Sequence, residues 1–317
     1  MRIVFMGVPE FAVPALERLI LGEHQVVAVY TQPDKPAGRG RVPTFPPVKQ
    51  VALEHGLEVR QVESFAEAGA IASLAQLRPD VIVVAAFGQI LPPQVLTIPP
   101  FGCINLHPSL LPRHRGPTPI PAAILAGDDW TGASIMLLDE GIDSGPILAQ
   151  RRVAIAPQDT TDSLARKLAQ IAAQLLEETL PTWLSHSLTP QPQREEDATY
   201  TKLLSKEEGE IDWQTPASQI WRRVRAFYPW PSCYTTWQGK MLKIVEAVPL
   251  RGERGDPGRV VSLGRGDVGV QSGGGILRLL RVQLEGRREM SAEEFLRGHR
   301  AFIGALLPSL RQEYAPG

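Results

Sequence analysis

The first half of the chain alternates short runs of β-branched and other apolar residues with segments whose apolar residues recur at helical spacing. This alternation predicts parallel strands with helices on both faces of the sheet. The strands are expected at Arg2–Met6, Gln25–Thr31, Val81–Ala85, Cys103–Leu106 and Ser134–Leu138, and the helices around Pro14–Leu21, Pro47–Glu54, Ala66–Gln76 and Pro119–Ala126. The sequence therefore predicts a doubly wound, Rossmann-like α/β domain with a parallel sheet.

The second half is predicted to form a long helix and then a smaller β domain. The helix is expected at Thr161–Leu184, and the polar stretch Thr189–Asp197 is expected to be a linker. After a helix at Pro216–Phe227, short strands separated by Gly-rich turns are expected at Lys240–Val248, Gly258–Ser262, Val268–Gln271 and Gly275–Leu284. Such strands favour an OB-like β-barrel. We expect domains at 1–189 and 207–317 joined by a linker at 190–206.

Composition restricts the class of protein. Hydrophobic residues make up 43% of the chain and charged residues 21%, unlike disordered or collagen-like chains. Apolar runs are shorter than the about 20 residues of a membrane span, and the first residues lack the pattern of a leader peptide. Cys103 and Cys233 lie far apart and outside any Cys-x-x-Cys pair, so neither a disulfide nor a zinc site is expected. We expect a cytoplasmic, bacterial-type monomer without a metal.

Charge is distributed unevenly along the chain. From Tyr200 onward there are 18 Lys and Arg against 13 Asp and Glu, a net charge of +5, whereas the first 199 residues carry 15 against 21, a net charge of −6. The positive half suits a polyanionic partner, but a charge of this size also fits an ordinary solvated surface.

Polar residues at the end of one predicted strand are candidates for a site. Asn105 and His107 are two residues apart, so their side chains leave the same side of the strand. Ligands of open α/β sheets bind beyond the carboxyl ends of the strands. The pair is therefore either a site or a structural hydrogen-bond network. Gly7 after the first strand lacks the further glycines of a dinucleotide loop, so NAD binding is not expected.

A second polar segment, Asp139–Gly145, follows another predicted strand. Gly141 and Gly145 permit a tight loop around Asp143. We expect this loop at the same carboxyl edge, where the carboxylate can reach the imidazole of His107. Asp-rich loops are commonly only turns. Asp143 is a candidate catalytic residue only because it is expected to pair with Asn105 and His107.

Together these stretches resemble the formyltransferase family that uses 10-formyltetrahydrofolate. The resemblance runs over nearly the whole chain and rests on Asn105-x-His107, Ser109-Leu-Leu-Pro112, Arg115-Gly116, Asp143 with its glycines, Phe11 with Pro14, the loop Thr31–Arg41, Ser205–Glu208, Ile211–Trp213 and Arg225–Pro231. It implies transfer of the formyl group of 10-formyltetrahydrofolate to the amino group of methionine on initiator transfer RNA. Pro108 stands where family members often have glycine.

The proposed catalytic residues Asn105, His107 and Asp143 suit this acyl transfer. The Asn105 amide can donate to the developing oxyanion. His107 can donate a hydrogen bond or a proton to that oxygen or to the leaving nitrogen, and Asp143 can orient His107, favour its charged form and accept the amine proton. A covalent route suits the sequence less, because Ser109 lies in no nucleophile elbow and Cys103 lies within an apolar strand.

For the folate donor, the resemblance implicates residues of three loops: Phe87, Gly88, Ile90, Leu91, Pro92, Ser109, Leu110, Leu111, Pro112, Asp139 and Gly141. Backbone groups on irregular loops suit a flat heterocycle with donors and acceptors along one edge. Ile90 and Leu91 fit a core position equally well.

The basic loop 33–49 is the first candidate for contact with RNA. It carries Lys35, Arg39, Arg41 and Lys49 against Asp34, together with five prolines and two glycines. Long loops without secondary structure are commonly functional. We interpret this loop as an arm that closes on the acceptor stem of a transfer RNA, the alternative being a solvated connector.

The second half supplies further candidates for contact with RNA. Arg222 and Arg223 are proposed to bind phosphates. Trp213, Trp221, Trp230 and Trp237 could stack on bases only if they are exposed, and we expect them to pack inside the protein.

Two other function classes compete with this interpretation. Nucleotide-sugar formyltransferases and hydrolase-type relatives share the catalytic residues, but the basic loop disfavours them. A non-catalytic RNA-binding protein would give Asn105, His107 and Asp143 no reason to converge.

Overall fold

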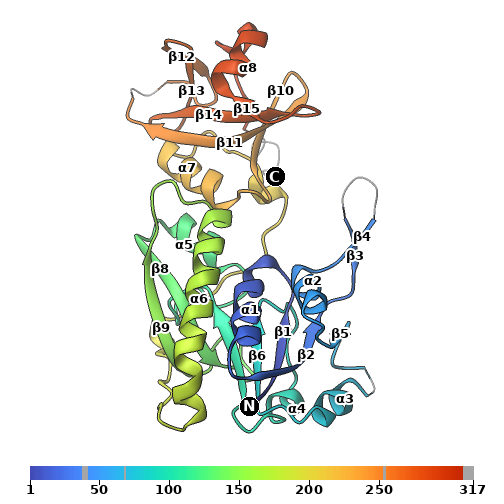
Figure 1. Ribbon diagram of the computed structural model, residues 1–317. Coiled ribbons are helices and arrows are strands. Elements are labelled where there is room, and N and C mark those ends of the chain that lie inside the picture. Colours follow the sequence, from blue (N-terminus) through green and yellow to red (C-terminus); the bar gives the residue numbers. More distant parts are fainter. Residues whose placement is uncertain (38–41, 68, 253–254, 310–317) are drawn as a thin grey trace, which may run out of the picture. The chain divides into compact units, whose positions relative to one another are not determined.

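The computed structural model describes residues 1–37, 42–67, 69–252 and 255–309 (Figure 1). The chain forms two compact units, each described here by itself. The first comprises Met1–Ile120, Asp129–Ile155 and Ser163–Lys202, and the second Pro121–Asp128, Ala156–Asp162 and Leu203–Gly317. Residues 190–202, expected to form a linker, therefore belong to the first unit, and two short segments of the first half belong to the second.

A seven-stranded sheet forms the centre of the first unit. Its strands are β1 (Arg2–Gly7), β2 (Gln25–Thr31), β5 (Val59–Gln61), β6 (Val81–Ala85), β7 (Cys103–His107), β8 (Trp130–Leu137) and β9 (Ile147–Ala154), in the order β5-β2-β1-β6-β7-β8-β9. The order reverses between β1 and β6, as in doubly wound folds. This confirms the predicted fold class.

The sheet is mixed rather than wholly parallel as predicted. β5, β2, β1, β6 and β7 are parallel, whereas β8 runs antiparallel to both β7 and β9. Periodicity gives no strand direction, and the short connection between β8 and β9 suits an antiparallel hairpin. β8 therefore ends with Leu137 beside Ile104, near the start of β7 and not at its carboxyl end.

Helices cover both faces of this sheet. The helices that lie wholly or partly within the unit are α1 (Val13–Leu21), α2 (Pro47–Glu54), α3 (Ala70–Gln76), α4 (Pro93–Leu96), α5 (Pro119–Ala126) and α6 (Thr161–Leu184). On β1, Phe5 packs in a core with residues of α1, α2 and α6, and Met6 packs in a separate core with residues of α3 and α4 (Figure 1). The alternation of side chains along apolar strands thus builds two cores, one on each face.

The second unit is built around an antiparallel sheet. Its elements are α7 (Ala217–Ala226), β10 (Cys233–Trp237), β11 (Lys240–Leu250), β12 (Val260–Gly264), β13 (Asp267–Gln271), β14 (Ile276–Leu284), β15 (Met290–Ser291) and α8 (Ala292–Gly298), with strands ordered β10-β11-β14-β13-β12 and β15 paired to β14. A small antiparallel β domain is confirmed. Its closure into a barrel stays a prediction.

The basic loop of the first unit contains a short hairpin. β3 (Lys35–Ala37) pairs antiparallel with β4 (Val42–Thr44). Arg39 and Arg41 lie outside the described residues. Across the described part of the chain, no helix is both long enough and apolar enough to cross a membrane.

Candidate active site

Strand β7 carries two polar side chains on one of its faces. Ile104 and Leu106 pack in the core that contains α1 and α6. Asn105 and His107 therefore leave the opposite face, as the spacing predicted. His107 is 4% exposed, so its polar atoms must find partners inside the protein.

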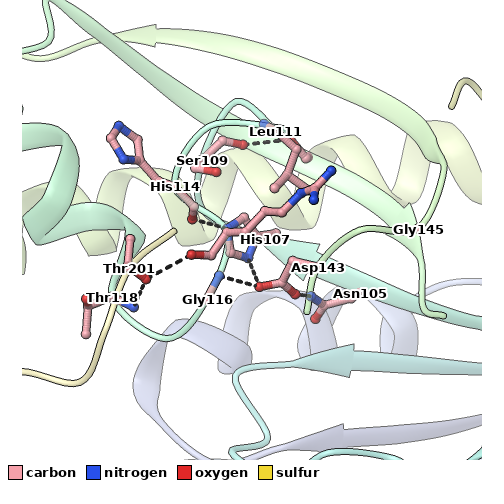
Figure 2. Close-up of polar contacts among 12 residues, drawn as sticks. Asn105, His107, Ser109, Leu111, His114, Gly116, Thr118, Asp143, Gly145 and Thr201 are labelled. Carbon is pink, nitrogen blue, oxygen red and sulfur yellow. Dashed lines mark hydrogen bonds and ion pairs between the residues drawn. The ribbon is translucent and has the colours of Figure 1, made fainter. Parts of the chain in front are cut away.

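Asp143 connects the two side chains (Figure 2). The Asn105 amide Nδ2 donates to Asp143 Oδ1 at 3.3 Å, and His107 Nδ1 lies 3.5 Å from Asp143 Oδ2. The backbone N–H of Gly116 donates to the same Oδ2 at 2.8 Å. The structure thus brings the three predicted catalytic residues together.

The Asp143 loop reaches this point by a different path from the predicted one. Because β8 runs antiparallel to β7, residues 138–146 begin beside the start of β7 and fold back to place the carboxylate next to His107. Asp143 has a φ of +48°, a left-handed conformation. A side chain at Gly145 would overlap the carbonyl oxygen of Leu137, so the loop requires glycine there.

The surroundings of His107 define where its protons lie. Its Nε2 is 3.0 Å from the carbonyl oxygen of His114, which can only accept a hydrogen bond, so Nε2 carries a proton. Burial lowers the pKa of His107, and the nearby Asp143 carboxylate acts in the opposite direction. Since burial is the larger effect, the imidazole is neutral at neutral pH, and Nδ1 is its proton-accepting atom. Asp143 thus favours the charged form of His107, as expected, but burial opposes it more strongly.

Residues 191–201, which we call the strap, hold the Asp143 loop and the loop that follows β7. Gln191 forms a backbone bridge with Ile147. The side chain of Gln193 donates to the carbonyl oxygens of Asp143 at 2.8 Å and Gly145 at 2.7 Å. The Asp143 loop is therefore fixed by a residue 50 positions later in the chain, which no local sequence pattern indicates.

Arg115 joins the strap to the loop that follows β7. It is 1% exposed, and its Nε donates to Gln193 Oε1 at 3.1 Å while Nη1 donates to Glu195 Oε2 and to the Tyr200 hydroxyl, both at 2.8 Å. Arg115 also pairs with the strap backbone, its N–H donating to Thr199 and its carbonyl accepting from Thr201, each at 2.8 Å. Gly116, whose N–H binds Asp143, follows directly.

The residues proposed for the folate donor fall into different environments. Phe87, Leu91 and Leu111 are buried, and the first two belong to the core beside α3 and α4. Ile90 is 86% exposed, so it is not a core residue. Gly88 lies in the loop after β6, the parallel neighbour of β7, and has a φ of +75°. Pro92 precedes α4, and Leu110 packs against Gly132.

The remaining proposed donor residues have internal partners. The Ser109 hydroxyl is fully buried and donates to the carbonyl of Arg113 at 2.6 Å, and Pro112 follows Leu111 through a cis peptide. Asp139 accepts from the N–H of Gly141 at 3.0 Å.

The two candidate nucleophiles near the site are Ser109 and Cys103. Burial raises the pKa of Cys103 to about 12. Ser109 and Cys103 are therefore structural, as expected, and not nucleophiles.

The residues proposed for RNA contact are partly engaged within the protein. Lys49 forms an ion pair with Asp34 at 2.7 Å, and Lys35 pairs with Thr44 through the backbone. The Arg222 guanidinium lies over Gly127, and Arg223 donates to the carbonyl oxygens of Glu208 and Glu210. Arg223 thus has a structural role that the sequence did not indicate.

The tryptophans of the second unit differ in exposure. Trp213 is fully buried and Trp237 is 7% exposed, which confirms the packing expected for them. Trp230 is 57% exposed, contrary to that expectation. Trp221 is half-buried and carries the guanidinium of Arg225 3.9 Å from its ring centre.

Comparisons with known proteins show the family of the chain. A formyl transferase family model matches residues 1–180, and a model of the formyl transferase C-terminal domain matches residues 203–300. The methionyl-tRNA formyltransferase of Dehalococcoides mccartyi is 48% identical over 310 residues, which cover 97% of this chain and 98% of that protein. The methionyl-tRNA formyltransferase of Roseiflexus castenholzii is 50% identical over 97% of this chain and 99% of its own length.

Solved structures share the fold at low sequence identity. An N-formyltransferase from Helicobacter canadensis, crystallised with folinic acid and dTDP-3-aminofucose, matches with a TM-score of 0.67 and 15% identity over 91% of this chain and 99% of that one. HypX from Aquifex aeolicus in complex with tetrahydrofolic acid matches with a TM-score of 0.62 and 19% identity over 93% of this chain and 47% of that one. From its domain matches and its near full-length relatives, this chain belongs to the formyl transferase family, within the group of methionyl-tRNA formyltransferases.

Proposed function

We propose that this chain transfers the formyl group of 10-formyltetrahydrofolate to the α-amino group of methionine esterified to initiator transfer RNA. The observation that carries the chemistry is the convergence of Asn105, His107 and the Gly116 N–H on one carboxylate, Asp143. The names of relatives that are 48% and 50% identical support the choice of acceptor. The side chains of Asn105, His107 and Asp143 come from one chain, so the proposed site needs no second copy of the protein.

The reaction begins with attack of a neutral amine on the formyl carbon. An α-amino group has an ordinary pKa of about 8, so part of the substrate is already neutral near pH 7. The attack forms a tetrahedral intermediate with an oxyanion. The Asn105 amide is the side-chain donor beside Asp143, and one such donor typically contributes ~10²–10³ in rate.

The His107–Asp143 pair can accept the proton that the amine loses. The Asp143 side chain is 16% exposed and that of His107 is 5% exposed, so the carboxylate is the group that a substrate reaches first. A neutral His107 turns the lone pair of Nδ1 toward Asp143 Oδ2, and one proton between these atoms relieves their repulsion. The pair can then return this proton to the folate nitrogen as the C–N bond breaks, so the charges balance.

The acceptor places this reaction in translation initiation. Charged transfer RNA is used in the cytoplasm, so we place the enzyme there. The half of the chain from Tyr200 onward carries the net positive charge of +5 and is proposed to contact RNA phosphates together with the basic loop.

A comparison of acceptors tests the proposal. The purified chain is given 10-formyltetrahydrofolate with methionyl initiator transfer RNA, an amine of the purine pathway or an amino-sugar nucleotide. We expect formyl transfer to the charged RNA at a kcat/KM at least ~10²-fold above either small amine, since the RNA offers many more phosphates for contact than a small amine does. Preferred transfer to the amino-sugar nucleotide would show that the chain acts on a different acceptor.

A further inference from the structure

The second unit contains a cavity that includes no residue of the candidate active site. Its volume is about 330 Å³, within the range of pockets for small molecules. Its walls come from the segment Ala156–Asp162, from α7 and the residues after it, and from β11 and β14. Every lining residue belongs to the second unit, so the cavity does not depend on how the two units are arranged.

A buried arginine forms one wall of this cavity. Arg225 is 9% exposed, and its Nη1 donates to the carbonyl oxygens of Ala156 at 3.4 Å and Asp159 at 3.2 Å. Its Nε is buried and has no hydrogen-bond partner in the described part of the chain. Arg225 also makes no ion pair within 4 Å among the residues that the structure describes. Burial and the nearby Arg222 lower the pKa of Arg225, and the buried Asp159 carboxylate raises it by less. The guanidinium, with its unpaired Nε, therefore favours an anionic ligand.

Aromatic rings and a second arginine complete the lining. Trp221 and Tyr228 are both half-buried and line the cavity, and the Trp221 ring carries the Arg225 guanidinium on one face. Arg281, which also pairs with Glu289 at 2.8 Å, and the exposed Glu246 are cross-strand neighbours on β14 and β11 and line the cavity. A bare phosphate would not use the aromatic walls, and an apolar ligand would leave the Nε of Arg225 without a partner. A small cation would meet two arginines.

We propose that this cavity binds a single nucleotide, with the phosphate near Arg225 and Arg281 and the base against Trp221 or Tyr228. Flat bases pack on aromatic rings whatever their sequence, and guanidinium groups pair with phosphate. The nucleotide could be free, or it could be an unpaired residue of a bound RNA. Only the second source rests on the function proposed above.

A titration of the full-length protein with AMP tests the site. Tryptophan fluorescence and calorimetry would follow binding from about 10 μM to about 10 mM AMP, because one small site is expected to bind in this range. The site is supported if AMP binding is saturable and if its dissociation constant rises at least ~10-fold in Arg225→Met and in Trp221→Leu. No saturable binding to the wild-type protein would overturn it.

A charge variant at the rim keeps the test decisive if Arg225→Met fails to fold. Glu246→Lys replaces an exposed carboxylate by a cation, so AMP binding should tighten by about 5-fold at low salt. Glu293→Lys is the matched control, because Glu293 is also exposed and changes the net charge equally but does not line the cavity. Equal effects of the two variants would exclude a phosphate at this cavity.

Competition with RNA separates the two sources. If initiator transfer RNA releases bound AMP, and Trp221→Leu weakens RNA binding, the nucleotide belongs to the RNA. If AMP stays bound in the presence of saturating RNA, the site takes a free nucleotide. Formyl transfer to charged RNA is measured in the same samples, so normal activity without AMP binding would reject the cavity site while leaving the proposed function intact.

Discussion

Replacing Gln193 by alanine removes the side chain that ties the Asp143 loop to the strap. The amide of Gln193 donates two hydrogen bonds, to the carbonyl oxygens of Asp143 and Gly145, and its oxygen accepts from Arg115. A hydrogen bond contributes about 1 kcal/mol net, so the loop loses about 2 kcal/mol of positioning from the two bonds it receives. Since 1.4 kcal/mol corresponds to a factor of ten, kcat should fall about 10- to 30-fold.

The assay measures kcat and the KM of each substrate separately. Gln193 contacts the catalytic loop through its backbone and is not proposed to touch substrate, so both KM values should change less than about 3-fold. Gln193→Glu keeps the shape and the contact with Arg115 but cannot donate to the two carbonyl oxygens, so it should resemble Gln193→Ala. Gln191→Ala is the matched control, because the exposed Gln191 side chain donates to the carbonyl of Thr189, outside the Asp143 loop. A wild-type kcat in Gln193→Ala would refute the role given to the strap.

Three further predictions concern the pH dependence of stability, the basic loop and the Asp143 loop. Burial lowers the pKa of His107 below its ordinary 6.5, so the unfolded chain binds its proton more readily and the free energy of unfolding should fall as pH drops below 6.5. His107→Gln should show a shallower fall in urea unfolding between pH 7.5 and about 5, and equal slopes would contradict the assignment. Arg39→Ala and Arg41→Ala should lower kcat/KM for charged RNA and reduce its salt dependence, whereas an unchanged salt titration would leave the loop as a connector. Gly145→Ala should lower kcat at least ~10-fold, because its Cβ would overlap the Leu137 carbonyl and displace the loop, and unchanged kinetics would show that the loop tolerates the shift.

The apolar runs of the first half predicted the positions of most strands because buried strands must be apolar on both faces. β9 was not predicted, since Gln150, Arg151 and Arg152 interrupt its apolar residues. As the edge strand of the sheet, β9 pairs with one strand of the described sheet, β8, and with the strap at Ile147, so its outer side tolerates these polar residues.

The candidate site was predictable where its residues lie close in sequence. The spacing of Asn105 and His107 placed both on one face of β7, and the structure agrees. The antiparallel direction of β8 and the contact of Gln193 with Asp143 depend on tertiary packing, which periodicity does not contain. Burial also outweighs the effect of Asp143 on the pKa of His107, and sequence alone gives no measure of burial.

The most direct test of the proposed chemistry is the rate of a single turnover in Asp143→Asn. This change keeps the shape of the side chain but removes the carboxylate that lies beside His107 Nδ1 and accepts from Asn105 and Gly116. With saturating 10-formyltetrahydrofolate and charged initiator transfer RNA, the rate of formyl transfer should fall at least ~10²-fold. The dissociation constant for the RNA should stay within about 2-fold of the wild-type value, because Asp143 is not proposed to contact RNA phosphates. A single-turnover rate equal to that of the wild-type protein would contradict the claim that Asp143 and His107 accept the amine proton.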